Sequence, residues 1–293
     1  MALIMKLGIQ KKVVISIVIV GILPLLVGLY LTYLDGKTTR RNSIGTSFQE
    51  LAKETADKID MVIGREVIDT QRLALSPNIR AAIKNKNNDQ ALIQYLTEFK
   101  KYDDKAVHSL LIVDSEGKFI AGINENNKGN YRNENWFTGA YNGDKGRVYV
   151  GDLKLEAGSD VYLINIAVPV TEGGTVVGLL VIRYSVDKLL SVINNVRFEE
   201  TGHATLVDSS GTIIMCPIFP LRSHQVNPDL IATIAQSQPG WGMVEDDAHG
   251  GHGSIIGFAP VRSTLVSENG WFDGKKWYIF TRQSPEEAYA PIY

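Results

Sequence analysis

Residues 111–120 read LIVDSEGKFI, and residues 205–214 read TLVDSSGTII. The two stretches align without a gap at an offset of 94 residues. Each has an apolar run, an Asp-Ser-x-Gly turn and a second run rich in apolar residues, which is the composition of two strands joined by a tight turn. The chain is therefore predicted to build one antiparallel sheet unit twice.

Further matches extend both copies of this unit. Residues 167–170 read AVPV and residues 258–261 read FAPV, while VIRYS ends at Ser185 and IFTRQS ends at Ser284. The first unit is expected to span about residues 107–186, with a loop-rich insertion at 123–144. The second unit is expected at about 202–284, and its last hairpin is longer by a segment within 263–274.

Composition limits the class of partner. The chain has 293 residues and 44% apolar content, which is enough for packed cores. The formal net charge is -2, but residues 1–41 carry six Lys or Arg and one Asp, so the remainder is acidic with a net charge of -7. An acidic body argues against nucleic acid as the partner. Cys216 is the single cysteine, so no intrachain disulfide can form.

The apolar segment 13–34 contains no charged residue and covers about 33 Å as a helix, enough to cross a hydrocarbon core of about 30 Å. A transmembrane helix is predicted here, and Pro24 is tolerable within it. The alternative is a signal peptide, but the apolar run is long and no small-residue cleavage site follows it. The flanking Lys and Arg counts are equal, so charge alone does not orient the segment.

A long amphipathic helix is predicted from Asn42 to about Leu75, where Ser76 and Pro77 end it. Its apolar stripe recurs every three or four residues and includes Phe48 and Ile59. The stripe could pack on the sheets of its own chain or on a second copy of the helix, and both alternatives stay open. Residues 78–102 are predicted to form short helices, and residues 187–196 a further one.

The chain resembles the double Cache (dCache) sensor regions of bacterial and archaeal transmembrane receptors, a group that includes chemoreceptors, sensor histidine kinases and cyclic-dinucleotide enzymes. The resemblance covers about residues 35–293. It rests on the apolar helix leading into a long helix, and on LIVDSEG at 111–117, NWF at 135–137, IAVPV at 166–170, GLLVI at 178–182, TGHATLVDSSG at 201–211, WYIF at 277–280 and QSPEEA at 283–288.

The resemblance implies an α/β (α+β) fold in which an N-terminal transmembrane helix continues into a long helix carrying two tandem PAS-like Cache modules built on antiparallel sheets. The expected organisation is a cytoplasmic N-terminus at 1–12, a membrane helix at 13–34, a stalk helix at 35–77, a membrane-distal module at 78–196 and a membrane-proximal module at 197–284. Residues 285–293 would begin a C-terminal helix towards a second transmembrane segment, so we expect the chain to be a fragment of a longer receptor of the cytoplasmic (inner) membrane, with its sensor region periplasmic or extracellular.

In the family the membrane-distal module usually holds the ligand. By position, the resemblance implies a ligand-binding wall of Tyr131, Arg132, Glu134, Trp136, Phe137, Tyr149, Asp152 and Arg183. In amino-acid-binding members an Arg two residues before the Trp holds the ligand carboxylate, and an Asp on the last strand holds the ammonium. Here Glu134 and Arg183 stand at these places with the charges exchanged, which argues against carrying over the α-amino-acid assignment.

The residues themselves support an anion site at Arg183. Alternation along strand 176–184 puts Val177, Leu179 and Val181 on the face of Arg183, so a guanidinium ends an apolar row. Such a group binds a carboxylate with two parallel donors. The alternative is an internal ion pair with Glu134 or Asp152.

Other features are expected to be structural. The segment Asp246-Asp-Ala-His-Gly-Gly-His252 holds metal-type side chains, but its glycines indicate a mobile, solvated hairpin connection, so neither a metal site nor any cofactor is predicted. Cys216 is expected to be a buried, inert thiol. No nucleophile elbow, phosphate loop or zinc-protease motif occurs, which argues against an enzyme.

The sequence therefore predicts a homodimeric, extracytoplasmic sensor that binds a small molecule, either an organic anion or an amine-bearing metabolite. The alternative from another class is a membrane-anchored module that binds a periplasmic protein; it predicts a closed first module and a large exposed apolar patch.

Overall fold

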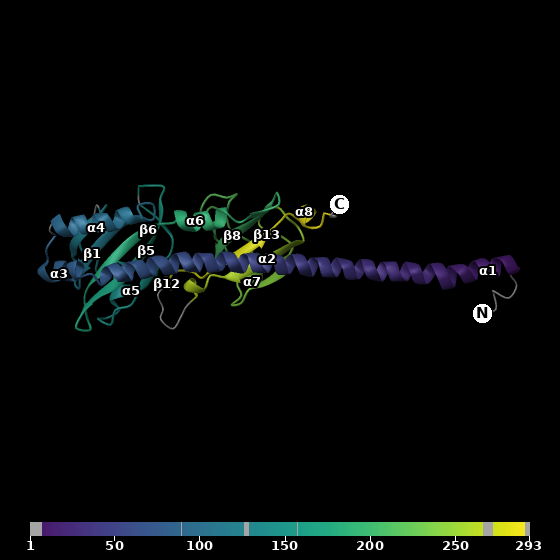
Figure 1. The fold of residues 1–293 in the computed structure, drawn as a ribbon, viewed down its shortest axis with the longest axis horizontal. Coiled ribbons are helices and arrows are strands. Elements are labelled where there is room, and N and C mark those ends of the chain that lie inside the picture. Colours follow the sequence, from purple (N-terminus) through teal and green to yellow (C-terminus); the bar gives the residue numbers. More distant parts are fainter. Residues whose placement is uncertain (1–7, 89, 126–128, 157, 266–271, 291–293) are drawn as a thin grey trace.

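The computed structural model describes residues 8–88, 90–125, 129–156, 158–265 and 272–290. A helical rod runs through its whole length, formed by α1 (Ile9–Ile17), a π-helical turn η2 (Val18–Ile22) and α2 (Leu23–Ala74) (Figure 1). The apolar part of the rod is not buried against the rest of the protein and is long enough to cross a membrane. The π turn ends two residues before Pro24, where a missing N–H disturbs regular α-helical bonding.

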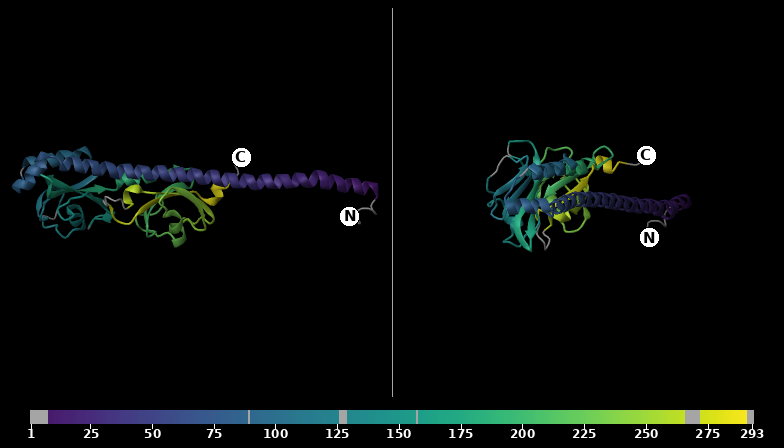
Figure 2. Two further views of the ribbon diagram at one scale, coloured as in Figure 1. Left: turned by 90° about the horizontal axis from the view of Figure 1, so that it is seen from below. Right: turned by 60° about the vertical axis from the view of Figure 1, so that its left-hand side comes forward.

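The far end of α2 agrees with the sequence prediction. The helix ends at Ala74, and Pro77 starts the next helix, α3 (Pro77–Asn85), which is followed by α4 (Gln90–Tyr102). Both modules lie on the same side of the rod, with the first module at its far end and the second nearer the apolar segment (Figures 1 and 2).

The first sheet has the order β12-β3-β5-β6-β1-β2 in the described residues, with β4 also pairing with β5. Its strands are β1 (Val107–Asp114), β2 (Phe119–Ile123), β3 (Tyr149–Gly151), β4 (Lys154–Leu155), β5 (Tyr162–Glu172), β6 (Thr175–Ser185) and β12 (Phe272–Asp273). All pairs are antiparallel except β12 with β3. Helix α5 (Asn135–Tyr141) packs against this sheet, and α6 (Asp187–Asn194) leads to the second.

The second sheet has the order β10-β11-β13-β8-β7, with β9 pairing with β8. Its strands are β7 (Arg197–Phe198), β8 (Gly202–Asp208), β9 (Ile213–Met215), β10 (Gly240–Val244), β11 (Ser254–Pro260) and β13 (Trp277–Arg282), and α7 (Pro228–Ile234), η3 (Arg262–Thr264) and α8 (Pro285–Ala288) connect or follow them. The predicted α+β class with a long N-terminal helix is confirmed.

The repeated Asp-Ser-x-Gly segments form the same hairpin twice. Asp114 Oδ1 accepts hydrogen bonds from the backbone N–H groups of Glu116 and Lys118, each at 2.9 Å. Asp208 Oδ1 accepts the equivalent bonds from Ser210 and Thr212 at 2.8 and 3.1 Å. Gly117 and Gly211 have φ of 80° and 86°, a backbone conformation that side chains disfavour, so local turn chemistry fixes both hairpins.

Helix α2 covers one face of both sheets. Ile59, Ile63 and Val67 of α2 belong to one apolar core that also contains Leu180 of the first sheet and Leu206 of the second. The helix comes so close to β11 that a Cβ on Gly257 would lie 2.0 Å from the carbonyl carbon of Phe48. The stripe on α2 therefore packs on its own sheets, as the first of the two alternatives predicted.

The opposite face of each sheet, which we call the outer face, has a core of its own. Residues of β1, β3, β5 and β6 pack there with α5 in the first module, and residues of β8, β11 and β13 pack with α7 in the second.

Two expectations are corrected. A β-bulge between the Val170–Gly178 and Thr171–Val176 pairs leaves Val177 unpaired, and its side chain packs with the core beside α2 instead of sharing the face of Arg183. The second correction concerns segment 263–274, which the sequence assigns to the second unit. Its strand β12 pairs with β3 of the first sheet, so this strand links the two modules.

Candidate functional site

Arg183 ends the outer-face row of β6, beyond the buried side chains of Leu179 and Val181. Its Nη1 lies 3.0 Å from Oε2 of Glu125, which stands two residues after β2. The Glu125 side chain is only 4% exposed, whereas that of Arg183 is 23% exposed. The predicted internal partners, Glu134 and Asp152, do not form this ion pair.

The second oxygen of Glu125 is held by Tyr131, whose hydroxyl donates to Oε1 at 3.1 Å. Burial and the negative charge of Glu125 raise the pKa of Tyr131 to about 12, so the hydroxyl keeps its proton and acts as a donor. Oε2 of Glu125 has no hydrogen-bond partner among the described residues, because its contact with Arg183 is an ion pair without hydrogen-bond alignment. The arrangement therefore retains capacity to bind a further polar group.

A row of polar side chains crosses the outer face at Arg183. In the strand register Arg183 stands between Asn165 of β5 and Ser109 of β1. The Ser109 hydroxyl is buried and has no hydrogen-bond partner in the described parts of the chain. Three neighbouring strands thus present polar groups at one level of an otherwise apolar sheet face.

These side chains border an open hollow of about 340 Å³, a size within the usual range of small-molecule sites. Both charges occur in its wall, three carboxylates against one guanidinium and one ammonium. The wall consists of Asn124, Glu125, Tyr131, Glu134, Trp136, Lys154, Leu155, Glu156, Leu163, Asn165 and Arg183.

Four of the residues named from the sequence line this hollow: Tyr131, Glu134, Trp136 and Arg183. Trp136 is buried at the start of α5 and packs against Tyr131, with ring centroids 5.5 Å apart. This aromatic pair forms an apolar wall beside the charged groups.

The other four lie elsewhere. Phe137 is buried and stacks on Tyr141, with ring centroids 5.4 Å apart, so it anchors α5 to the core. Tyr149 is buried against α5, and its hydroxyl donates to Oδ2 of Asp273 on β12 at 2.7 Å; burial and this carboxylate raise the pKa of Tyr149.

Arg132 is exposed and is not part of the wall. Asp152 lies 3.8 Å from Arg222 of the second module, and burial is the main reason that its pKa is raised. It therefore belongs to the contact between the modules.

The sequence reasoning missed Glu125 and Asn165. Glu125 lies inside the loop-rich insertion, where no periodicity marks which side chains turn inward. Asn165 did carry a signal, because it is the one polar residue in the run Leu163-Ile-Asn-Ile-Ala167 of β5. A polar side chain on the buried face of such a strand needs a partner.

A larger hollow of about 910 Å³ lies where the rod leaves the second module. Its wall includes Lys37, Arg40 and Arg41 of α2 together with Met243 and Tyr289. Arg40 donates to the backbone oxygens of Ala288 and Ala290, so its guanidinium holds the chain beyond β13 against the helix. This hollow is distant from the outer face of the first module.

The second module has polar groups on its outer face as well. Asp247 is fully buried and accepts hydrogen bonds from Ser254 Oγ at 2.7 Å and from Arg282 Nε at 2.9 Å. Burial alone would raise the pKa of Asp247, but these bonds outweigh it and lower the pKa. The loop that was expected to be mobile and solvated is thus pinned at its centre.

Cys216 also departs from the expectation of an inert thiol. Burial opposes ionisation of the thiol, but the imidazoles of His203 and His249 beside it outweigh burial and lower the pKa of Cys216 to about 5. His249 belongs to the pinned loop, so the fold brings this loop and the Cys216 thiol together.

The fold, two antiparallel sheets on one long helix, is that of the Cache class of domains. A family model described as Cache domain (dCache_1) matches residues 36–292, and the chain belongs to this family. The chain is 23% identical over 295 residues to the methyl-accepting chemotaxis protein PscA of Pseudomonas syringae pv. tomato. The aligned region covers 98% of this chain and 43% of PscA. The chain thus spans less than half the length of this relative.

Solved structures of chemoreceptor domains share the fold. The ligand-binding domain of the amino acid chemoreceptor PctC of Pseudomonas aeruginosa, in complex with GABA, is 20% identical with a TM-score of 0.58, covering 82% of this chain and 99% of that one. That of CtaA of Pseudomonas fluorescens, in complex with L-isoleucine, is 19% identical with a TM-score of 0.60, covering 87% and 98%.

Proposed function

We propose that this chain is the extracytoplasmic ligand-sensing region of a transmembrane receptor, and that the hollow beside Arg183 binds a small organic molecule carrying a carboxylate and an amine. The observation that carries the proposal is the Arg183–Glu125 pair, because it places a partly exposed guanidinium and a buried carboxylate side by side at an open hollow. A ligand that carries both charges can bind Arg183 with its carboxylate and Glu125 with its ammonium. These two contacts compensate for breaking the ion pair between Arg183 and Glu125.

The charge of the wall favours a zwitterion over a simple anion. Glu125, Glu134 and Glu156 outnumber Lys154 and Arg183, so a ligand with only negative charge would meet net repulsion. Arg183 would bind the carboxylate, and Glu125, with its second oxygen held by Tyr131, would bind the ammonium.

The exchange of charges relative to amino-acid-binding members is compatible with this ligand class. An acidic loop and a basic last strand can hold the same zwitterion in the reversed direction, with its carboxylate towards β6. That PctC and CtaA were solved with amine-bearing carboxylic acids supports this choice among organic anions.

Membrane anchoring completes the proposal. The apolar helix would cross the inner membrane, with residues 1–12 in the cytoplasm and both modules outside. Binding in the first module would bias the packing of its sheet on α2, which continues directly into the apolar segment. A ligand can shift such an equilibrium only by its difference in affinity for the two packings. As for the chemotaxis protein PscA, the output would be chemotaxis.

Calorimetric titration of the whole chain in detergent micelles tests the binding proposal. Amino acids, carboxylic acids without an amine and amines without a carboxylate form the three ligand sets. We expect at least one amino acid to bind, and its deaminated and decarboxylated analogues to bind at least about 10-fold more weakly, since a charge-assisted hydrogen bond contributes about 1.5–3 kcal/mol.

Arg183→Ala should abolish this binding, whereas Arg132→Ala is a matched control because Arg132 is exposed and outside the wall. If Arg183→Ala binds the same ligand with unchanged affinity, the hollow is not the site.

A further inference from the structure

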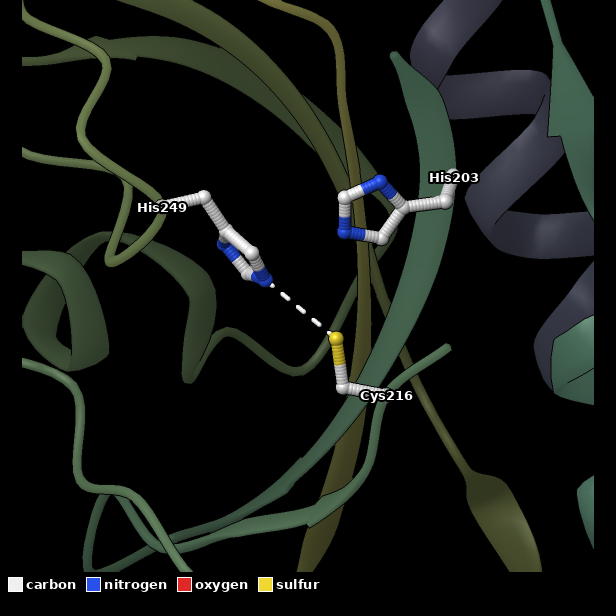
Figure 3. Close-up of side chains that lie close together, drawn as sticks. All are labelled: His203, Cys216 and His249. Atoms are coloured by element: carbon white, nitrogen blue, oxygen red, sulfur yellow. Dashed lines mark hydrogen bonds between the residues drawn. The ribbon is translucent and has the colours of Figure 1, made fainter. Parts of the chain in front are cut away.

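Three potential metal ligands meet on the outer face of the second sheet. His203 projects from β8, Cys216 follows β9 directly, and His249 lies in the loop between β10 and β11 (Figure 3). One ligand atom from each side chain lies within 4.8 Å of the others, and Cys216 Sγ is 3.3 Å from His249 Nε2. Residues far apart in the sequence thus converge on one point.

Both imidazoles are oriented through their Nδ1 atoms. His203 Nδ1 lies 2.8 Å from the carbonyl oxygen of Thr201, and His249 Nδ1 lies 2.9 Å from that of Asp247. A carbonyl oxygen only accepts hydrogen bonds, so each Nδ1 carries a proton, and the neutral form of each ring has its lone pair on Nε2. Backbone carbonyls orient metal-binding histidines in this way in known metal sites.

The Nε2 of His203 is an unpartnered buried atom. His203 is fully buried, and its Nε2 has no hydrogen-bond partner among the described residues, although it points towards the space shared with Cys216 and His249 (Figure 3). A thiol–imidazole hydrogen bond accounts for Cys216 and His249 but not for this second lone pair. A buried nitrogen acceptor without a partner is unfavourable unless something binds there.

The surroundings hold the three side chains in place. The carboxylate of Asp247 accepts hydrogen bonds from the backbone N–H groups of His249 and Gly251, each at 3.0 Å, and its other oxygen is fixed by Ser254 and Arg282. The ring of Phe219 stacks on His249, with centroids 4.8 Å apart. The backbone N–H of Ile218 donates to Cys216 Sγ at 3.4 Å, which favours a thiolate.

We propose that His203, Cys216 and His249 form a metal site in the second module, built for a transition-metal ion with Zn²⁺ as the best match. Two imidazole nitrogens and one thiolate suit Zn²⁺ and not Ca²⁺ or Mg²⁺, which require oxygen ligands. Around a tetrahedral Zn²⁺ the sulfur and a nitrogen ligand stand roughly 3.5 Å apart, close to the observed separation of Cys216 and His249.

A fourth position would be open to water or to a further ligand. Cys216 and His203 are buried, whereas His249 is half-buried, so the approach is from the loop side. The ion would link β8, the segment after β9 and the loop before β11, and binding would therefore stabilise the second module. The proposal does not depend on the ligand of the first module.

Equilibrium dialysis with metal analysis tests the site. The full chain, produced without a polyhistidine tag, is stripped with a chelator under a phosphine reductant and dialysed against Zn²⁺ in detergent micelles. We expect one Zn²⁺ per chain, no retention of Ca²⁺ or Mg²⁺, and a rise of several degrees in Tm on adding Zn²⁺. With Co²⁺ as a probe we expect a thiolate-to-cobalt absorption band.

Cys216→Ser and His249→Asn should each weaken Zn²⁺ binding at least about 100-fold, since loss of even an orienting outer partner costs about 10- to 100-fold. His252→Asn is the matched control, because His252 lies in the same loop but outside the cluster. Unchanged Tm of metal-free His249→Asn would show that this variant is folded. Failure of the wild-type chain to retain Zn²⁺, or retention by both ligand variants, would overturn the proposal.

Discussion

Arg183 and Glu125, 58 positions apart in the sequence, meet at 3.0 Å across the outer face of the first sheet. The loop after β2 brings the carboxylate over the end of β6, where Asn165 and Ser109 flank the guanidinium in the neighbouring strands. Tyr131 donates a hydrogen bond to Glu125, and all three side chains line the hollow. In this geometry a ligand that carries a carboxylate and an ammonium can replace the ion pair between Arg183 and Glu125 by two ion pairs, one with each residue.

Glu125→Gln should weaken the binding of amino acids but not the binding of carboxylic acids that lack an amine. The amide keeps the shape of the side chain but removes the charge proposed to hold the ammonium, so we expect amino acid affinity to fall about 10- to 100-fold, as expected for loss of a charge-assisted hydrogen bond of about 1.5–3 kcal/mol. Carboxylic acids without an amine should bind no worse than before, since one negative charge has been removed.

Calorimetric titration of both ligand sets gives the result, with Glu116→Gln, an exposed residue outside the wall, as control. Equal weakening of both sets would argue that Glu125 only positions Arg183.

Tyr131 makes a prediction for alkaline pH. Its folded-state pKa is raised to about 12 from an ordinary value of 10, so the folded protein holds this proton more tightly than the unfolded chain. The resulting stability is fully present below about pH 10 and is lost progressively as the pH rises towards 12. Burial also raises the pKa values of Tyr149 and Tyr184, which contribute in the same direction.

We expect Tyr131→Phe to lose less stability than the wild-type chain over this range, measured by urea denaturation at several pH values. An identical pH dependence for the two proteins would contradict the raised pKa.

Local turn chemistry and periodicity predicted most of the scaffold. The Asp-Ser-x-Gly hairpins need only contacts within five residues, and the amphipathic stripe of α2 shows in its spacing. The face of Arg183 followed from simple alternation over Leu179 and Val181. Alternation failed at Val177, because the bulge that displaces this residue depends on how β5 and β6 pair and is not encoded in β6 alone.

The side chains that complete both sites could not be predicted in the same way. Glu125 lies two residues after β2, outside any periodic segment, so nothing in the sequence pairs it with Arg183. His203, Cys216 and His249 are separated by 12 and 32 intervening residues, and only the pairing of β8 with its neighbours brings them together. The motif at 246–252 therefore shows His249 and His252 as possible metal ligands, but it does not show His203 and Cys216, which lie beside His249 in the fold.

The contact of α2 with the second sheet makes a prediction for stability. A Cβ on Gly257 would lie 2.0 Å from backbone of Phe48, and backbone on both sides leaves little room for adjustment. Gly257→Ala should cost at least about 2 kcal/mol of unfolding free energy, as overpacking does. Gly64 of α2 is the matched control, because no atom lies within 4 Å of its added Cβ.

Gly64→Ala should stabilise the protein by about 0.5–1 kcal/mol through helix propensity. Chemical denaturation of the two variants checks both signs. A neutral Gly257→Ala would mean that α2 does not lie so close to β11 in solution.

We expect two copies of the chain to associate through the exposed side of α2. Met61, Ile68 and Leu75 are 69%, 48% and 66% exposed and recur every seven residues, opposite the stripe that packs on the sheets. A seven-residue apolar repeat is the pattern by which two helices associate. We therefore expect two copies of the chain to meet along this row, with both membrane helices on the same side of the pair.

Ile68→Cys tests the pairing directly. Cys216 is the only native cysteine and is buried, so the new thiol is the one exposed cysteine in the chain. Mild oxidation in membranes should convert Ile68→Cys to a disulfide-linked dimer, whereas Lys101→Cys, an exposed position on α4, should remain monomeric. Met61→Glu added to Ile68→Cys should reduce the cross-linked fraction because two carboxylates would face each other. Equal cross-linking at positions 68 and 101 would indicate random collision and would exclude this row as the interface.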